Sequence, residues 1–273
     1  MSVKELCRIL GLSRSAYYRW RNSLPSPRQA QNAELLEAIR TVWKQHRQTY
    51  GSPSITDALR KQGWRCGENR VARLMRLHGI RAKTKRRFRH TTDSSKTVSG
   101  APNLVQRRFV AQRANQLWCS DITYVWTREG WLYLAMILDV FSRRIVGYAL
   151  GIRLNAGLVS EALRRALHTR TVSSETVFHS DRGSQYASQE VRTLLTSHGL
   201  RQSMSSTGSC YDNAIAESFF HTLKTELIYH ERYQSRQQAT RSIFDYIEIF
   251  YNRHRRHSAL GYHSPVDFEQ LHS

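Results

Sequence analysis

The chain has 273 residues, of which 42 are Lys or Arg and 21 are Asp or Glu, so its formal net charge is +21. No stretch reaches the ~18 apolar residues that a membrane span needs. The four cysteines are isolated, with no CxxC pair, which disfavours a thiolate metal site and fits a reduced compartment.

The positive charge is concentrated in the N-terminal part of the chain. Residues 1–113 hold 25 basic and 6 acidic residues, whereas residues 114–273 hold 17 basic and 15 acidic residues. This asymmetry predicts a module that binds a polyanion such as DNA, joined to a near-neutral second module, with binding that weakens as salt rises. A charged, solvated surface is the alternative for any single stretch.

Residues 1–28 are predicted to form a first helix-turn-helix segment. A short helix with one apolar face is followed by Gly11, which can turn the chain, and by Ser13, which can cap a second helix. Helix pairs of this kind bind DNA or serve only as packing or oligomerisation units, and the sequence leaves both roles open.

Residues 29–90 are predicted to form a second, longer helix-turn-helix domain that binds DNA. Its middle helix is expected to have Ser52 as its cap and Pro53 as its first helical residue. Its last helix, in ENRVARLMRLHG, has an inward apolar face made of Val71, Leu74, Met75 and Leu77. The other face carries Arg70, Arg73 and Arg76, a spacing that would lay guanidinium groups along a major groove.

A basic run and a linker follow this domain. Six of the nine residues from 81 to 89 are Lys or Arg. We expect this run, including Lys85, Arg86 and Arg87, to act as an arm on DNA phosphates. Residues 91–112 are rich in Ser and Thr, which is typical of a linker.

Residues 113–230 contain strand and helix signals in an order that predicts an α/β domain. Strands are expected near 117–126, 131–138, 144–150, 176–178 and 200–204. Helices are expected near 156–168, 188–198 and after a cap at 212 or 213. Residues 231–273 are predicted to form a helical and basic extension of this core.

Three acidic residues lie where the backbone could present carboxylates to one site. Asp121 interrupts an apolar run in QLWCSDITYVW, Asp181 follows a strand in VFHSDRGSQY, and Glu217 lies in the first turns of a helix in YDNAIAESFFHTLKTEL. Asp139 and Asp212 are rivals, since one ends a strand-like run and the other resembles an N-cap. For any single acid a solvated charge or a cap is the commoner role, so the surrounding motifs decide.

Four motifs together, WCSDITY, HSDRGSQY, DNAIAESFFHTLKTEL and YNRHRRHSALGYHSP, resemble those of an orfB-type DDE transposase of insertion-sequence family three, a relative of retroviral integrases. The likeness spans residues 30 to 268, and the 35 residues between Asp181 and Glu217 are the spacing of that family. It implies a ribonuclease H-like integrase core, a mixed five-stranded sheet with flanking helices, preceded by all-α helix-turn-helix domains. Unlike retroviral integrases, the chain has no N-terminal His/His/Cys/Cys zinc module.

The resemblance also implies a chemistry. Asp121, Asp181 and Glu217 would be both the catalytic residues and the metal ligands, and carboxylates without imidazole or thiol suit two Mg²⁺ ions, with Mn²⁺ as a substitute. In a two-metal scheme Asp121 would bridge both ions, while water frees a 3′-hydroxyl at an element end and this hydroxyl attacks another phosphodiester. The implied function is metal-dependent DNA cleavage and strand transfer.

Other residues are weaker candidates for DNA contact. His221 and Lys224 lie four and seven positions after Glu217, on the same helical face, beside the expected reacting phosphate. Packing or solvent exposure is an equal alternative for His221. A basic cluster of the C-terminal tail is predicted to bind DNA or a partner subunit, and it comprises Arg253, Arg255 and Arg256.

The expected partners are the terminal inverted repeats of the element, target DNA, at least one further copy of the chain, and an upstream orfA product or frameshift fusion. No membrane partner is expected, and the expected location is the bacterial cytoplasm, at the nucleoid. Two other classes of protein remain open as alternatives to a transposase. A non-catalytic DNA-binding protein would not need the three acids, and a metal-dependent nuclease would cut strands without joining them.

Overall fold

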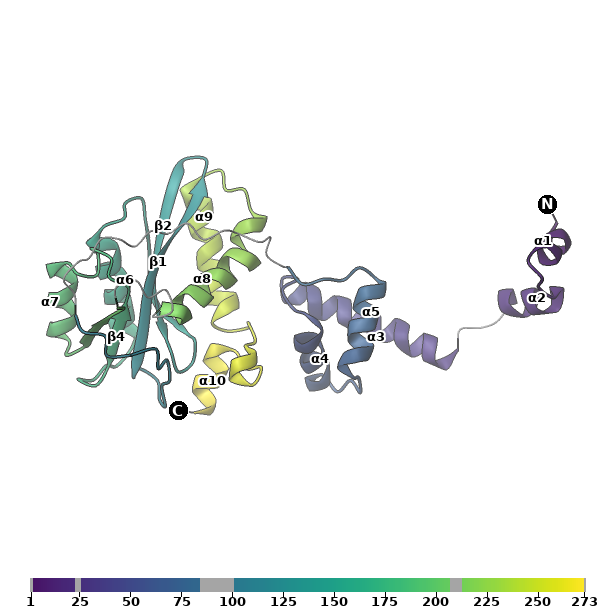
Figure 1. Cartoon of the computed structure of the whole chain (residues 1–273), viewed down its shortest axis with the longest axis horizontal. Helices are drawn as coiled ribbons and strands as arrows, with labels where there is room; N and C mark the ends of the chain where they lie inside the picture. The colour runs from purple at the N-terminus through teal and green to yellow at the C-terminus, as the bar shows by residue number, and fades with distance from the viewer. Residues whose placement is uncertain (1, 23–25, 84–100, 207–212, 273) are drawn as a thin grey trace. The chain divides into compact units, whose positions relative to one another are not determined.

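The structure is a computed structural model that describes residues 2–22, 26–83, 101–206 and 213–272. The chain divides into two compact units, Met1–Arg81 and Ala82–Ser273, and each is described by itself. Figure 1 labels the helices and strands used below. None of the helices in these ranges combines the length and the hydropathy of a membrane span.

The described part of the N-terminal unit is helical. Its helices are α1 (Val3–Ile9), α2 (Arg14–Asn22), α3 (Pro27–Gln45), α4 (Ser52–Lys61) and α5 (Glu68–Leu77). Helices α3, α4 and α5 share an apolar core that includes Leu35, Ile39, Ile55, Leu59 and Val71. Helices α1 and α2 bury only Cys7 between them, so their apolar side chains stay largely on the surface.

Two details predicted for this unit are wrong. The N-cap of α4 is Gly51, and Ser52 is already the first helical residue. Leu77, expected to pack inward, is 67% exposed. The reason is that α5 ends there: the chain reverses at Gly79, whose φ is 65°, and Ile80 is buried instead.

The C-terminal unit contains a mixed five-stranded sheet, which confirms the predicted fold class. Its strands are β1 (Leu117–Thr127), β2 (Gly130–Asp139), β3 (Ile145–Gly151), β4 (Val177–Ser180) and β5 (Arg201–Met204). They follow the order β3-β2-β1-β4-β5 across the sheet. The first three strands pair antiparallel as a meander, and β4 and β5 run parallel to β1.

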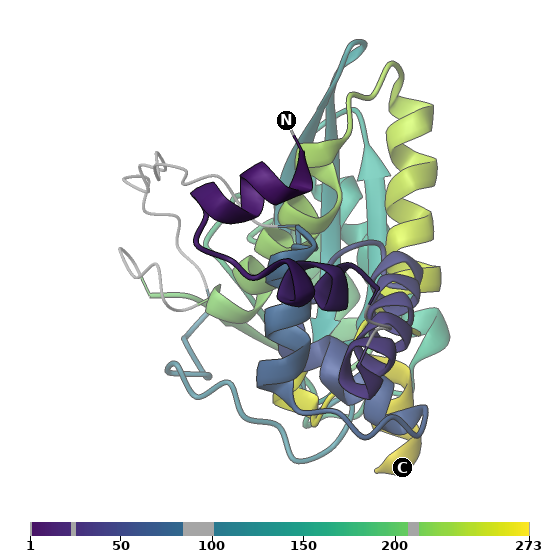
Figure 2. The ribbon, with the colours of Figure 1, turned by 90° about the vertical axis from the view of Figure 1, so that its right-hand side faces the viewer.

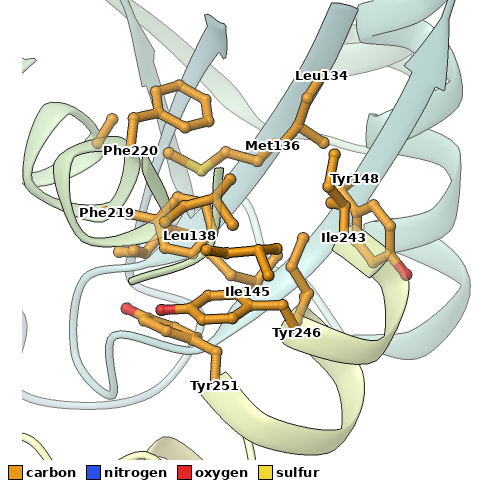
Figure 3. Close-up of a cluster of buried hydrophobic side chains, with 14 of the residues drawn as sticks. Leu134, Met136, Leu138, Ile145, Tyr148, Phe219, Phe220, Ile243, Tyr246 and Tyr251 are labelled. Carbon is orange, nitrogen blue, oxygen red and sulfur yellow. The ribbon is translucent and has the colours of Figure 1, made fainter. Parts of the chain in front are cut away.

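Helices cover both faces of this sheet (Figures 1 and 2). They are α6 (Ala156–Thr169), α7 (Gln189–Ser197), α8 (Ala214–Glu226), α9 (Arg236–Phe244) and α10 (Pro265–Leu271), with short turns η2 (Ile228–His230), η3 (Asp245–Tyr251) and η4 (Ser258–Leu260). Helices α6 and α7 pack with Trp118, Ala135 and Phe178 on one face. On the other face α8, α9 and η3 enclose a second core, where Met136 and Leu138 meet Phe219 and Tyr246 (Figure 3).

The C-terminal segment is joined to this core by buried charges. Arg255 Nη2 lies 2.7 Å from Glu226 Oε1 at the end of α8, and the Tyr246 hydroxyl donates to Glu226 Oε2 at 2.7 Å. Burial raises the pKa of the Tyr246 phenol, and the neighbouring Glu226 raises it further. The prediction that Arg255 binds DNA or a partner subunit is therefore wrong, because its guanidinium is paired with Glu226 inside the fold.

Candidate active site

Two of the predicted acids meet where β1 and β4 run side by side. The last registered pair of these parallel strands is Cys119 with His179. Asp121 and Asp181 each follow that pair by two residues, so Asp121 within β1 and Asp181 just after the end of β4 occupy equivalent positions. Neighbouring strands lie about 4.8 Å apart and side chains two residues apart share a face, so this register brings the two acids together.

Asp121 is half-buried in β1, and its carboxylate is strongly perturbed. Removal from water raises the pKa of Asp121 to about 8, and the negative charge of Asp181 is the next largest cause. Glu217 raises this pKa as well, whereas Lys224 and the backbone N–H of Ile122, which donates to Oδ1 at 2.7 Å, lower it. One carboxylate therefore experiences the charge of both other predicted site residues.

Asp181 lies in the loop after β4 and is exposed as a residue, but its carboxylate lies close to the backbone of Gly183. Desolvation raises its pKa, while the backbone N–H of Gly183, which donates to Oδ1 at 3.0 Å, and the charge of His179 lower it. A Cβ on residue 183 would lie 3.0 Å from that same oxygen. Glycine therefore lets the loop fold back closely over the carboxylate.

Glu217 is an exposed residue in the first turn of α8, near the positive end of the helix dipole. The N-cap position belongs to Asn213, one of the two predicted caps, but its side chain makes no capping bond. Asn213 Nδ2 instead donates to the carbonyl of Ser120 at 3.3 Å. This contact joins the start of α8 to the strand that bears Asp121. Asp212, the other predicted cap and a rival acid, lies outside the described residues.

The three carboxylates share an electrostatic environment but not a finished coordination sphere. Within the described ranges no three His, Cys, Asp or Glu side chains are gathered closely enough to hold one metal ion. Asp181 influences the Asp121 pKa more than Glu217 does. The two aspartates thus form the assembled half of the site, and Glu217 has to approach them for all three to share an ion.

Two buried side chains that sequence reasoning did not assign support this half. The Tyr186 hydroxyl lies 3.0 Å from Ser120 Oγ. Burial raises its pKa, and Asp121 and Asp181 raise it further. His179, two residues before Asp181, is fully buried, with Nδ1 2.8 Å from Ser203 Oγ. In the sequence Tyr186 is only the last residue of HSDRGSQY, with nothing to show that its ring is buried in the core beside Ser120.

The rival acid Asp139 has a structural role. It is fully buried at the end of β2, where its carboxylate accepts the backbone N–H groups of Asn115 at 2.7 Å and Phe141 at 3.0 Å. Burial raises its pKa to about 6. Asp139 therefore fixes the chain at the far end of β2 and does not join the pair formed by Asp121 and Asp181.

The predicted DNA contacts occupy different environments. On α8, His221 is exposed, and Lys224 is half-buried with Nζ 5.4 Å from the centre of the Tyr124 ring. On α5, Arg73 and Arg76 are exposed, but Arg70 is half-buried and its Nε donates to Asn32 Oδ1 at 2.8 Å. The predicted phosphate arm lies outside the described residues, and it comprises Lys85, Arg86 and Arg87.

Comparison with known proteins adds independent information. The integrase core domain matches residues 111–210 and again residues 217–272, and an HTH-like domain matches residues 30–88. The chain is 44% identical over 265 residues to an uncharacterized 31 kDa protein of insertion element IS600 from Shigella sonnei, covering 97% of each chain. It is 41% identical over 270 residues to the transposase InsF for insertion sequence IS3A of Escherichia coli strain K12, covering 98% of this chain and 94% of that one. The catalytic core domain of BIV integrase aligns with a TM-score of 0.44 at 17% identity, over 57% of this chain and 95% of that domain.

Proposed function

Because the chain belongs to the IS3-family transposases and is a DNA-binding DDE polynucleotidyl transferase, we propose that Asp121, Asp181 and Glu217 are the acids that carry its chemistry. The observation that supports this most directly is the register of β1 and β4, which places Asp121 and Asp181 side by side next to the helix that bears Glu217. The perturbed Asp121 carboxyl, sensitive to both other acids, agrees with it.

Integrase-type cores use a divalent metal, and the donor set of this site fits a hard cation. Its proposed ligands are carboxylate oxygens only, which favours Mg²⁺, with Mn²⁺ as a substitute. We propose two ions, with Asp121 shared between them and Asp181 and Glu217 holding one each. When bound, such ions polarise the phosphodiester and help water or a hydroxyl to lose its proton.

The side chains of the chain then have distinct tasks. Burial and the charge of Asp181 raise the pKa of Asp121, and this carboxyl binds a cation in its ionised form, so cation binding is coupled to release of a proton. Lys224 and His221, which follow Glu217 along α8, are proposed to hold the DNA backbone. Water attacks the phosphodiester at the element end and breaks its bond to the 3′-oxygen, which is released as a 3′-hydroxyl; this hydroxyl then attacks another phosphodiester and displaces the 3′-oxygen of that strand. No step needs a covalent bond between DNA and protein.

The other proposed parts concern recognition and assembly. Residues 29–90 would bind the terminal inverted repeats, with Arg73 and Arg76 of α5 in the major groove and Arg70 beside them. Residues 1–28 would add a second contact, and 91–112 would connect these parts to the core at 113–230. Because two element ends must be joined, we propose at least a dimer, working with an upstream orfA product or as a frameshift fusion. The proposed place of action is the bacterial nucleoid.

The test is a cleavage and strand-transfer assay on labelled DNA that carries the element ends. With Mg²⁺ or Mn²⁺ the unmutated chain should give both cut and joined products, and Asp121→Asn, Asp181→Asn and Glu217→Gln should each give neither. Glu190→Gln, which changes an exposed acid on α7, is the matched control and should retain activity.

Three results would contradict the assignment. Full activity in any of the three site variants would remove that residue from the proposed set. Cleavage without joining under all conditions would indicate a nuclease. Loss of activity in Glu190→Gln to the same extent as in the site variants would show that the assay reports folding rather than chemistry.

A further inference from the structure

An exposed aromatic cluster lies on the β1–β2 hairpin, a few residues from the proposed site. Tyr124 and Trp126 of β1 and Trp131 of β2 are 57%, 59% and 43% exposed. The Trp131 ring centre lies 5.0 Å from that of Tyr124 and 4.8 Å from that of Trp126, in edge-to-face arrangements. We call these three residues the aromatic cluster.

The fold itself does not account for this exposure. The alternate residues of β1, Thr123, Val125 and Thr127, are buried, so one face of the hairpin is packed against the core. The other face would ordinarily carry polar groups where no helix covers it. Figure 1 shows the tip of the hairpin projecting past α6, the helix that covers the same sheet further down. Three large rings on an uncovered face indicate a binding surface.

The charges around the cluster favour a polyanion over an apolar protein surface. The Lys224 ammonium lies 5.4 Å from the Tyr124 ring centre, and Arg236 Nε donates to the carbonyl of Trp131 at 3.1 Å. A cation on either side of exposed rings is the composition with which proteins bind single-stranded nucleic acid: bases stack on the rings and phosphates contact the cations.

The cluster is also continuous with the proposed site. Lys224, which borders the Tyr124 ring, lies close enough to Asp121 for its charge to lower the pKa of that carboxyl. Along β1, Tyr124 follows Asp121 by three residues, so the two side chains leave opposite faces of the strand; Lys224 of α8 is the group that links them.

We propose that the aromatic cluster stacks unpaired bases of the DNA strand beside the phosphodiester that reacts. The inference rests on the proposed function, because it takes its position from the carboxylates. Its consequence is that the protein favours DNA whose strands are separated next to the element end, since stacking on the rings replaces stacking lost from the duplex.

The test compares two duplexes of mixed sequence, one blunt and one with a five-nucleotide single-stranded overhang, bound to the full chain in EDTA. Fluorescence anisotropy gives both affinities while no strand is cut. The unmutated chain should prefer the overhang, and Trp126→Leu should lose about ten-fold of that preference, as expected for one lost stacking contact, with little change for the blunt duplex. Trp126→Phe, which keeps an aromatic ring, should retain most of the preference.

Two controls make the result specific. Phe244→Ala removes an exposed ring on α9 outside the cluster and should leave the preference unchanged. Overhang bases replaced by 5-iodouracil should crosslink under light to a peptide that contains Tyr124, Trp126 or Trp131. Equal behaviour of Trp126→Leu and Trp126→Phe, crosslinks confined to other peptides, or the absence of any overhang preference would overturn the proposal.

A separate measurement tests whether a second copy of the chain, instead of DNA, covers the aromatic cluster. If sedimentation without DNA shows an oligomer that dissociates in Trp126→Leu, the cluster is a protein interface and the proposal is wrong.

The Asp181→Asn variant should keep the overhang preference in EDTA. Cleavage by that variant would refute the proposed active site, a result that the overhang measurement alone cannot give.

Discussion

Replacement of Asp121 by Asn is expected to stabilise the metal-free protein while it abolishes catalysis. The folded state raises the pKa of Asp121 from 3.8 to about 8. Between these values the folded chain keeps a proton that the unfolded chain releases, so the wild-type protein loses stability as pH rises. At ~1.4 kcal/mol per pH unit the loss reaches about 4 kcal/mol at pH 7 and approaches about 6 kcal/mol above pH 8. Asn carries no charge and escapes this loss.

The measurement is urea unfolding in EDTA at pH 5, 7 and 8. Because the chain has two compact units, the transition is followed by hydrogen exchange in peptides from β1 and β2. The stability of Asp121→Asn relative to the wild type should increase with pH. When Mg²⁺ replaces EDTA this difference should become smaller, because a bound cation offsets the repulsion between the carboxylates. Asp267→Asn, which changes an exposed acid on α10, should show no such trend. Parallel pH dependences for the wild type and Asp121→Asn would refute the reasoning.

Three further predictions concern the framework around the site. Arg255→Met leaves Glu226 buried without its cation and should lower the free energy of unfolding by about 3–5 kcal/mol; a urea titration should show partial recovery when Glu226→Gln is added. Gly147→Ala places a Cβ 2.4 Å from a backbone carbonyl of α6 and should cost about 1–3 kcal/mol. Gly157→Ala, whose Cβ would make only an ordinary van der Waals contact with Asn155 Oδ1 at 3.7 Å, should cost nothing, as thermal unfolding can show. Asn213→Ala frees the start of α8 from β1 and should slow single-turnover cleavage about ten-fold, with unfolding changed by no more than about 1 kcal/mol.

The regular elements could be predicted because their signals are local. Alternation and β-branched residues in β1 and β2, and apolar periodicity in α6 and α7, belong to short stretches of chain, and the structure has these elements close to the expected places. Errors occurred where tertiary contacts decide. Leu77 has the spacing of a core residue, but the reversal at Gly79 buries Ile80 in its place.

The residues of the site were likewise predictable only in part. Asp121 and Asp181 could be nominated from their motifs, but only strand order and register bring two residues 60 positions apart together. The basic tail shows the opposite failure. Composition placed Arg255 in a cluster predicted to bind DNA or a partner subunit, and nothing local in NRHRRH reveals that Arg255 pairs with the buried Glu226, 29 residues earlier.

Helix α8 is fixed to the rest of the domain at both of its ends. Its start is joined to β1 by the bond from Asn213 to the Ser120 carbonyl, and its end by the buried pair of Glu226 and Arg255. Between them Phe219 and its neighbours pack on the sheet (Figure 3). A rigid shift of α8 would break the buried pair at a cost of several kcal/mol. Glu217 must therefore reach the two aspartates by rotation of its side chain or by adjustment within the first turn of the helix, where the hydrogen bond from Asn213 to β1 is long, at 3.3 Å.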